Sequence, residues 1–259
     1  MKSTFFFSFY ILVNLSVFSQ LEKTKPYQSG EWLEYKMSYS GFLKAGTATL
    51  ELKETTLDEK KVLYAKGYGE TSTVIGWFFK VSDTYESYFD TEIPKPYFFK
   101  RDVNEGGYTI KRDTKFDYEK QLATVEDHKH KTVKTFEIGE VQDMISSFYF
   151  LRTIETDTLG QGEEVTLDIF FDSKTFPFKL RFLGTEVLKT KFGKVKTLKF
   201  RPLVQAGRVF KENESVTIWV TADKNKIPIK LKASLAVGSL RAELKSFKGL
   251  ANSFKIIID

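Results

Sequence analysis

The residue types that most often carry chemistry are scarce in this sequence, which contains two histidines and no cysteine. His128 and His130 stand two positions apart in DHKHK, so they could share one face of a strand and bind a metal ion weakly. The flanking lysines would repel a divalent cation, and no third ligand is evident. We therefore expect both histidines to be exposed loop residues, and we predict no metal ligand and no cofactor.

Motifs for covalent catalysis or phosphate binding are also missing. The nearest string to a G-x-S-x-G elbow is VGSLR, which places its serine directly after Gly238 in a strand-rich hairpin and does not match. No G-x-x-x-x-G-K string occurs. Paired carboxylates of the glycosidase kind stay open, since Asp83, Glu86, Asp168 and Asp172 could meet across strands. We expect a protein that is not an enzyme, we assign no catalytic residue, and we keep a carboxylate-based hydrolase as an alternative.

One short stretch, DMISSFYFLR at residues 143–152, reads as a helix in a chain that elsewhere alternates like β-strand. On a helical wheel most of its apolar residues, Phe148 among them, occupy one broad arc, and Ser146, Ser147 and Phe150 lie elsewhere. Asp143 is a good N-cap because its carboxylate can accept an orphan backbone N–H at the positive end of the helix dipole. Since so short a helix is marginal alone in water, we expect it to pack on the concave apolar side of a sheet, as a plug or lid for the core.

Arg152 falls within the apolar arc of this helix. One interpretation is that its guanidinium contacts the last carbonyls of its own helix, or that its stem covers the core while its head reaches water. The other is a buried cation that meets a carboxylate or an anionic headgroup. On the second interpretation, Arg152 and Phe148 are candidate ligand-binding residues.

A second basic feature begins in FKLRFLG, where Lys179 and Arg181 lie opposite the apolar residues of one strand. Four more lysines follow on the next two strand segments, at positions 189, 191, 194 and 196. A solvated sheet face is the favoured interpretation, and a ligand-binding basic stripe that includes Lys179 and Arg181 is the other. In KVKTLKFR the polar and apolar sides switch between Lys196 and Leu198, which suggests a β-bulge there.

The elements that must position these residues are strands. After Gly30 the chain alternates with period two in segment after segment, most clearly in EWLEYKMSYS and KIPIKLKASL. QLATVED and TVKTFEI flank DHKHK as a predicted hairpin, and Asp223 to Lys226 form a predicted turn before Pro228. At least ten short strands predict a mainly β fold, which is a single curved antiparallel sheet or a partly closed β-barrel with one short helix packed against it.

The first residues, MKSTFFFSFYILVNLSVFSQ, combine Lys2, an apolar run, and small residues at Val17 and Ser19, as a secretory signal peptide does. We predict a signal peptide at residues 1–19 and a single β-rich domain at residues 20–259. No later apolar run approaches ~18 residues, so we expect no transmembrane helix in the mature chain. Without a cysteine for a lipid anchor or a disulfide, the expected location is the periplasm or the cell exterior.

The formal net charge of +6 is spread among interspersed lysines and acids, as in LELKETTLDEKK. This pattern is typical of a solvated surface, and an anionic envelope surface is the alternative partner. We do not expect nucleic acid as a partner, because no basic run is interleaved with exposed aromatic residues.

Three segments, GFLKAGTATLEL, DMISSFYFLR and VTIWVTADKNKIPIKLKASLAVGSLRAEL, together resemble the hallmark blocks of a bacterial exported family known only as domain of unknown function 3108. The resemblance covers residues 26–248. It implies an exported, antiparallel β-rich fold with a helix packed against a curved sheet, and it brings no activity, substrate or catalytic residue. Some relatives suggest a loose similarity to periplasmic lipoprotein carriers and capsule-export accessory proteins.

The function we expect is that of an exported, non-enzymatic cell-envelope protein whose curved sheet and helix enclose a pocket for an amphiphilic lipid or glycolipid. One alternative is an envelope scaffold or assembly partner of another envelope protein, without a small ligand. Another is an outer-membrane β-barrel, because alternation alone does not distinguish a lipid-facing side from a packed core.

Overall fold

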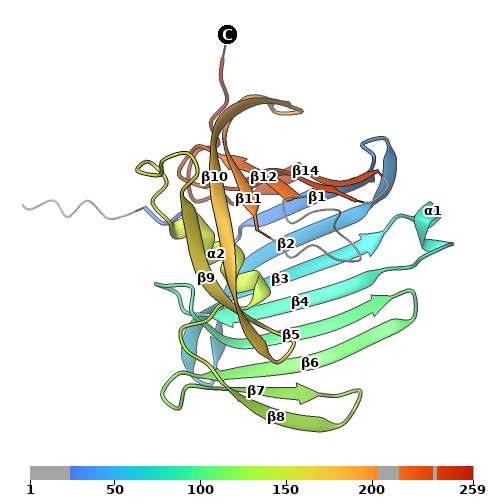
Figure 1. Ribbon diagram of the computed structural model, residues 1–259, viewed down its shortest axis with the longest axis vertical. Coiled ribbons are helices and arrows are strands. Elements are labelled where there is room, and N and C mark those ends of the chain that lie inside the picture. Colours follow the sequence, from blue (N-terminus) through green and yellow to red (C-terminus); the bar gives the residue numbers. More distant parts are fainter. Residues whose placement is uncertain (1–23, 204–215, 236–237, 259) are drawn as a thin grey trace, which may run out of the picture.

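The computed structural model describes residues 24–203, 216–235 and 238–258, which form one 14-stranded antiparallel sheet (Figure 1). Strands β1 to β8 follow one another in space, β9 to β14 do the same, and β1 pairs with β14. The strands are β1 (Trp32–Tyr39), β2 (Leu43–Leu57), β3 (Lys60–Thr71), β4 (Ser82–Phe89), β5 (Pro96–Glu105), β6 (Tyr108–Asp117), β7 (Leu122–Asp127), β8 (Thr132–Glu137), β9 (Glu164–Phe171), β10 (Lys174–Thr190), β11 (Gly193–Pro202), β12 (Val216–Thr221), β13 (Pro228–Ser234) and β14 (Ser239–Lys248). The signal peptide predicted for residues 1–19 lies outside the described residues.

The sheet curls into a barrel-like shape without closing, because β8 and β9 stand at the two ends of its strand order. The β9–β10 hairpin lies against the concave face near this opening, where Asp172 in its turn contacts Arg101 of β5 and Arg112 of β6. This arrangement confirms the predicted mainly β fold, a curved and partly closed antiparallel sheet. The predicted hairpin is also present as β7 and β8, and the predicted turn joins β12 to β13.

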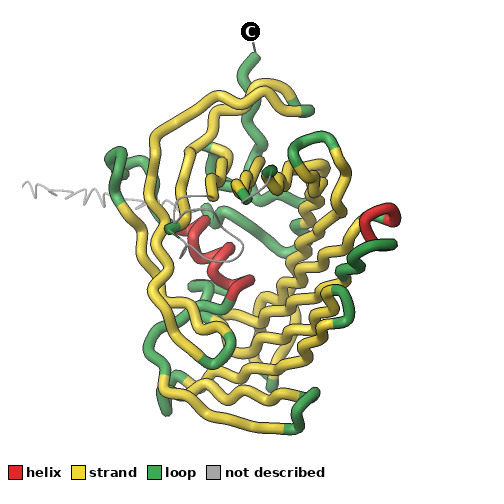
Figure 2. Tube along the Cα trace, turned by 45° about the vertical axis from the view of Figure 1, so that its right-hand side comes forward, coloured by secondary structure: helices red, strands yellow, loops and turns green. Residues whose placement is uncertain are grey.

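The described residues include two helices, α1 (Thr73–Gly76) between β3 and β4, and α2 (Met144–Thr153) inside the space that the sheet encloses (Figure 2). The N-terminus of α2 is fixed by a capping box, as its sequence indicates. The Asp143 carboxylate accepts the backbone N–H groups of Ile145 and Ser146 at 2.7 and 2.8 Å, and the Ser146 hydroxyl accepts the N–H of Asp143 at 2.9 Å. The predicted helix and its cap are therefore confirmed.

The buried side of α2 differs from the predicted apolar arc. Ser146, Ser147, Tyr149 and Arg152 are buried, whereas Phe148 is only half-buried. The reason is that α2 contacts β3 and β4 on one side and β9 on another, so several of its faces meet protein. An amphipathic wheel assumes one wet side and one dry side, and that assumption fails for an enclosed helix.

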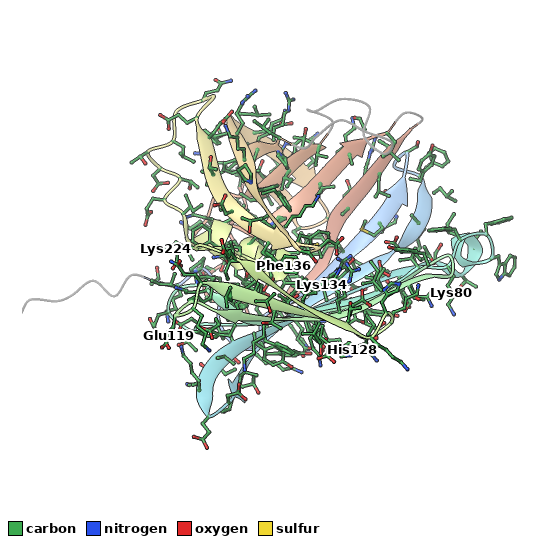
Figure 3. All side chains as sticks on the ribbon, turned by 60° about the horizontal axis from the view of Figure 1, so that its bottom comes forward. Lys80, Glu119, His128, Lys134, Phe136 and Lys224 are labelled. Atoms are coloured by element: carbon green, nitrogen blue, oxygen red, sulfur yellow. The ribbon has the colours of Figure 1, made fainter. Side chains whose placement is uncertain are left out.

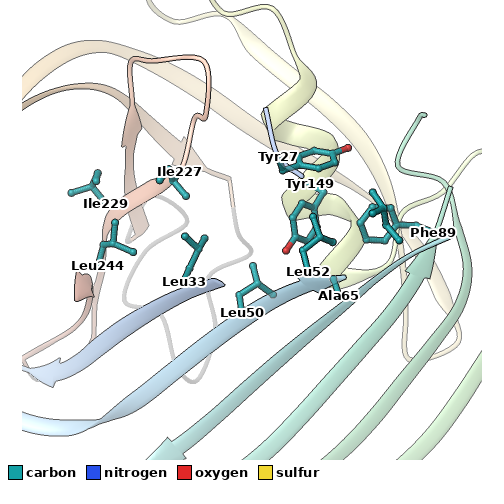
Figure 4. Packing of buried hydrophobic residues seen from close by; sticks show 11 residues of the cluster. Tyr27, Leu33, Leu50, Leu52, Ala65, Phe89, Tyr149, Ile227, Ile229 and Leu244 are labelled. Atoms are coloured by element: carbon teal, nitrogen blue, oxygen red, sulfur yellow. The ribbon is translucent and has the colours of Figure 1, made fainter. Parts of the chain in front are cut away.

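The hydrophobic core surrounds α2 on several sides (Figure 4). Tyr149 lies at the centre of the largest cluster, where its ring packs 5.0 Å from that of Tyr27 and 5.2 Å from that of Phe89. Ile145 packs against both this cluster and a second one that joins β5 to β8 with Phe170 of β9. Leu151 packs against a third cluster on β10 and β11. The helix therefore connects the two halves of the sheet.

The register between β10 and β11 shifts between Phe182 and Gly184. Lys196 and Leu198 pair with β10 without a shift, so the β-bulge predicted between them is wrong. Since β11 continues to alternate, Lys196 and Leu198 share one face of it. This face lines the cavity described next.

Candidate functional site

A cavity of about 1190 Å³ opens at the C-terminal end of α2. This volume exceeds the ~300–1,000 Å³ of most small-molecule sites, so a ligand with a short acyl chain would fit. Segments far apart in the sequence form its walls: the lead-in to β1, the β4–β5 turn, the residues after α2, one face of β10 and β11, the β12–β13 turn and the C-terminal segment. The lining residues are Thr24, Lys25, Pro26, Glu92, Ile93, Pro94, Arg152, Thr153, Glu155, Thr156, Asp157, Leu159, Phe182, Thr185, Lys196, Leu198, Ala222, Asp223, Lys224, Lys226 and Lys255.

Arg152 lies at the inner wall of this cavity, and its guanidinium is held by protein groups. It donates to the two carboxylate oxygens of Glu31 at 2.6 and 2.7 Å, to the Pro26 carbonyl at 2.8 Å, and to the Asn225 carbonyl at 2.8 Å. Arg152 is 3% exposed and Glu31 is 1% exposed. Burial opposes the charged form, but the hydrogen bonds and the negative charge of Glu31 outweigh it and raise the pKa of Arg152.

In the structure Arg152 is thus a buried cation that pairs with a carboxylate, as the second interpretation expects. The carboxylate belongs to the chain itself, and the guanidinium lies among the rings of Tyr27, Phe148 and Tyr149 at 5.4 to 5.6 Å. Arg152 therefore closes the floor of the cavity as part of a paired group.

Three lysines at the mouth of the cavity differ from Arg152 in having no partner for their charge among the described residues. The side chains of Lys196, Lys224 and Lys255 form no hydrogen bond or ion pair with any part of the chain that the structure describes. All three are exposed, and Lys224 projects at the end of the molecule opposite Lys80 (Figure 3). Their ammonium groups are available to an anionic ligand.

The β12–β13 turn brings these three lysines together. The backbone N–H of Ala222 donates to the carbonyl of Lys196 at 3.0 Å, which joins the turn to β11. The Asp223 carboxylate accepts the backbone N–H of Lys255 at 3.2 Å, which joins the turn to the C-terminal segment. The same carboxylate also accepts from Thr221 and from the N–H of Asn225, so it maintains the turn.

An apolar wall faces the space beneath the lysines. Phe182 of β10 and Leu198 of β11 line the cavity and belong to the third core cluster, and Leu159 packs against that cluster. These side chains are held by their strands, so the wall is preformed. The site therefore combines an apolar wall with a mouth where the three lysines stand among exposed acids, Glu155 and Asp157 included.

The other predicted ligand-binding residues lie outside the cavity lining. Phe148 packs against the first core cluster, with its ring 5.2 Å from that of Tyr149. Lys179 and Arg181 lie on the opposite face of β10 from Phe182, and both pair with Glu164 of β9, at 3.2 and 3.0 Å. The structure does not bring these three residues together with the cavity.

The two histidines lie near the β7–β8 turn beside carboxylates. His128 is 3.2 Å from Asp113, and His130 is 3.1 Å from Asp127, where Arg112 also pairs at 2.8 Å. Within the described ranges, no three histidine or acidic side chains gather in a way that could hold a metal ion.

The four carboxylates considered for glycoside hydrolysis do not converge. Asp83 is buried on the concave face of β4 and accepts the backbone N–H of Asn104, whereas Glu86 lies on the other face and bonds Tyr64. Asp168 is exposed on β9, and Asp172 is bound to arginines. Their strand positions therefore do not place all four around one cleft.

Comparison with known families decides the affiliation of the chain. The sequence matches the protein family of unknown function DUF3108 over residues 34–245. The chain belongs to the DUF3108 family. This confirms the resemblance carried by its three segments. No curated protein matches the sequence of this DUF3108 protein.

Two solved structures match this chain at low sequence identity. A β-barrel-like protein of the family DUF1849 from Brucella abortus has a TM-score of 0.52 and 10% identity, with coverage of 85% of this chain and 98% of that one. A candidate exported protein with a YmcC-like fold from Bacteroides fragilis has a TM-score of 0.36 and 8% identity, with coverage of 87% and 98%. The first similarity supports the barrel-like fold. Among the described residues, no helix has the length and apolar character needed to cross a membrane.

Proposed function

We propose that this DUF3108 protein is an exported, non-enzymatic binding protein of the cell envelope, and that the cavity at the end of α2 holds an amphiphile with an anionic head. The observation that carries the proposal is the group of unpaired lysines, Lys196, Lys224 and Lys255, above the apolar wall of Phe182 and Leu198.

In this arrangement the ligand's head and tail contact different parts of the cavity. A phosphate or carboxylate head meets the lysine ammonium groups, which form charge-assisted hydrogen bonds with it. The tail lies against Phe182, Leu198 and Leu159, where each buried methylene contributes about 0.8 kcal/mol. Arg152 forms part of the cavity floor and does not contact the ligand's head, because its guanidinium is already paired with the Glu31 carboxylate.

Support for binding without catalysis comes from the residue types in the cavity. Its described lining contains no histidine, and its buried carboxylate, Asp223, is used by the β12–β13 turn. Lys25 pairs with Glu92 at 2.9 Å at the rim. The other carboxylates of the lining, Glu155 and Asp157, are exposed.

A titration with dodecyl phosphate tests the proposal, with dodecyl maltoside as the probe that has the same tail and a neutral head. The variant Lys196→Gln/Lys224→Gln/Lys255→Gln removes the three lysine charges at the mouth. The matched control Lys36→Gln/Lys174→Gln/Lys189→Gln removes three exposed lysines outside the cavity. We expect the cavity variant to bind dodecyl phosphate about tenfold or more weakly, and the control to bind as the wild type does.

The wall is tested separately by filling the cavity. Thr185 lines the cavity from β10 and is exposed, so Thr185→Trp should narrow the space while the core stays intact. We expect this variant to bind both detergents more weakly at an unchanged melting temperature. Wild-type protein that binds neither detergent would instead favour a scaffold without a small ligand.

A further inference from the structure

The end of the molecule opposite the cavity mouth carries a group of exposed apolar side chains. Trp77 and Phe78 follow α1 and are 79% and 86% exposed. They belong to a surface contributed by the β1–β2, β3–β4 and β5–β6 connections, which we name the aromatic tip; its residues are Phe42, Leu43, Val74, Trp77, Phe78, Phe79 and Tyr108. Exposed side chains of this size and number in one place indicate an interaction surface.

Hydrogen bonds hold these three connections side by side. Ser72, the N-cap of α1, donates its backbone N–H to the carbonyl of Ala45 at 2.8 Å and its hydroxyl to the carbonyl of Lys44 at 2.9 Å. On the other side, the N–H of Gly106 donates to the carbonyl of Lys80 at 2.8 Å. The Phe79 ring covers Gly106 so closely that a Cβ there would lie 2.4 Å from it. The tip is therefore a fixed part of the fold.

The tip projects from the sheet as a convex feature. The α1 connection extends beyond the ends of β3 and β4 in both views (Figures 1 and 2). A stable protein interface buries ~1,200–2,000 Å² in total, which two convex tips of a few side chains would not provide to each other. A convex aromatic element fits a soft, penetrable partner better than a rigid one.

The charges beside the tip indicate the nature of this partner. Lys44 and Lys80 flank the aromatic residues, and neither side chain forms an ion pair within the described chain. Lys129 lies over the Tyr108 ring at 5.5 Å. Nearby acids include Glu70 on β3, the buried Asp83 on β4 and Glu105 on β5. Tryptophan and phenylalanine favour the boundary between headgroups and acyl chains, and lysines favour anionic headgroups.

We propose that the aromatic tip docks this protein onto an anionic lipid bilayer, with Trp77 and Phe78 inserted among the headgroups and Lys44 and Lys80 at the surface. The geometry resembles that of interfacial membrane anchors, which bury an apolar face only ~5–10 Å deep. This inference is independent of ligand binding in the cavity, which lies at the other end of the molecule (Figure 3).

Flotation of the mature protein with vesicles tests the inference. Vesicles of phosphatidylethanolamine and phosphatidylglycerol are compared with vesicles of phosphatidylcholine. We expect the wild type to float with the anionic vesicles, and Trp77→Ser/Phe78→Ser to lose about fivefold or more of the bound fraction at an unchanged melting temperature. Lys44→Gln/Lys80→Gln should weaken binding to the anionic vesicles only, and the loss should grow smaller as salt rises.

Two control variants separate docking through the tip from a general effect of exposed apolar residues and from ligand binding in the cavity. Val133→Ser/Val187→Ser removes exposed apolar side chains elsewhere on the sheet and should float as the wild type does. The cavity variant with three glutamines should also float normally. The inference is overturned if wild-type protein stays with the buffer, or if Trp77→Ser/Phe78→Ser floats unchanged. It is equally overturned if sedimentation shows that these two residues hold a dimer that does not bind vesicles.

Discussion

Arg152 in α2 binds Glu31 through two hydrogen bonds of 2.6 and 2.7 Å, across 121 residues of sequence. Both side chains are buried, and the Pro26 and Asn225 carbonyls accept the remaining guanidinium hydrogen bonds. This contact joins α2 to the chain before β1 and to the β12–β13 turn. One ion pair thus holds together the segments that form the floor of the cavity.

Breaking this pair should destabilise the protein strongly. Arg152→Met leaves the Glu31 carboxylate buried without its cation, and Glu31→Gln leaves the buried guanidinium without a neutralising charge, so each should cost about 3–5 kcal/mol in the free energy of unfolding. Urea denaturation of both single variants and of the double variant measures their coupling. We expect the double variant to lose less than the sum of the two single losses. Additive losses would mean that the pair is not formed in solution.

Stability should depend on pH through Asp143. Burial raises the pKa of this carboxyl from 3.8 to about 6, although hydrogen bonds from Ser87, Ser146 and Ile145 favour its charged form. At a pH between 3.8 and about 6, the Asp143 carboxyl is ionised in the unfolded chain but still protonated in the folded one. The free energy of unfolding therefore falls as pH rises through this range, and above about pH 6 the loss stays constant. This increase in the pKa of Asp143 corresponds to a loss of up to about 3 kcal/mol in the free energy of unfolding.

The variant Asp143→Asn isolates this effect, because asparagine also caps helices and does not titrate. We expect the stability of the wild type relative to Asp143→Asn to fall between pH 4 and pH 6.5 in urea denaturation. A relative stability that stays constant over this range, or that increases, would show that Asp143 is ionised in the folded protein throughout.

The core position of Tyr149 predicts an unequal effect at two adjacent residues of α2. Tyr149 is fully buried between Tyr27 and Phe89, whereas Phe148 is half-buried. Tyr149→Ala should cost about 3–5 kcal/mol and Phe148→Ala clearly less. Phe148→Asp should still destabilise the fold, because the ring packs on the first core cluster. Equal melting temperatures for the two alanine variants would mean that α2 is rotated about its own axis relative to the arrangement described here.

The contact of Asp172 with Arg101 and Arg112 predicts local stability at the open side of the sheet. Asp172→Asn removes the charge that these arginines share, so the β9–β10 hairpin should open more easily. Hydrogen exchange should become faster in the hairpin and stay unchanged in β1 and β14, which are far from it in the strand order. Asp168→Asn, an exposed residue of the same hairpin, is the matched control. Faster exchange in both variants would remove the specific role of Asp172.

Local patterns in the sequence predict the elements of this fold well. Alternation identifies the strands, and the cap at Asp143 marks the start of α2, because both signals depend on residues close together in the chain. The outward direction of Lys179 and Arg181 also follows from alternation with Leu180 and Phe182. Their partner, Glu164, follows only from the register of β9 with β10.

The candidate site depends on contacts that local patterns do not contain. Arg152 stands out on the helical wheel, but Glu31 could not be chosen as its partner among many acids. Lys196 is visible in the sequence as part of a basic stripe, whereas Lys224 and Lys255 reach it only through the β12–β13 turn and the C-terminal segment. The mutual position of such segments is set by tertiary packing, which single-sequence periodicity does not report.

The most direct test of the cavity is to identify the residues that an amphiphile contacts. Dodecyl phosphate with a diazirine at the end of its tail is irradiated with the purified protein, and the labelled peptides are identified by mass spectrometry. We predict labelling of β10 and β11 around Phe182 and Leu198, suppressed by excess dodecyl phosphate and by Thr185→Trp. Labelling confined to the aromatic tip or to the outer face of the sheet, or labelling that neither treatment reduces, would contradict the cavity as a binding site.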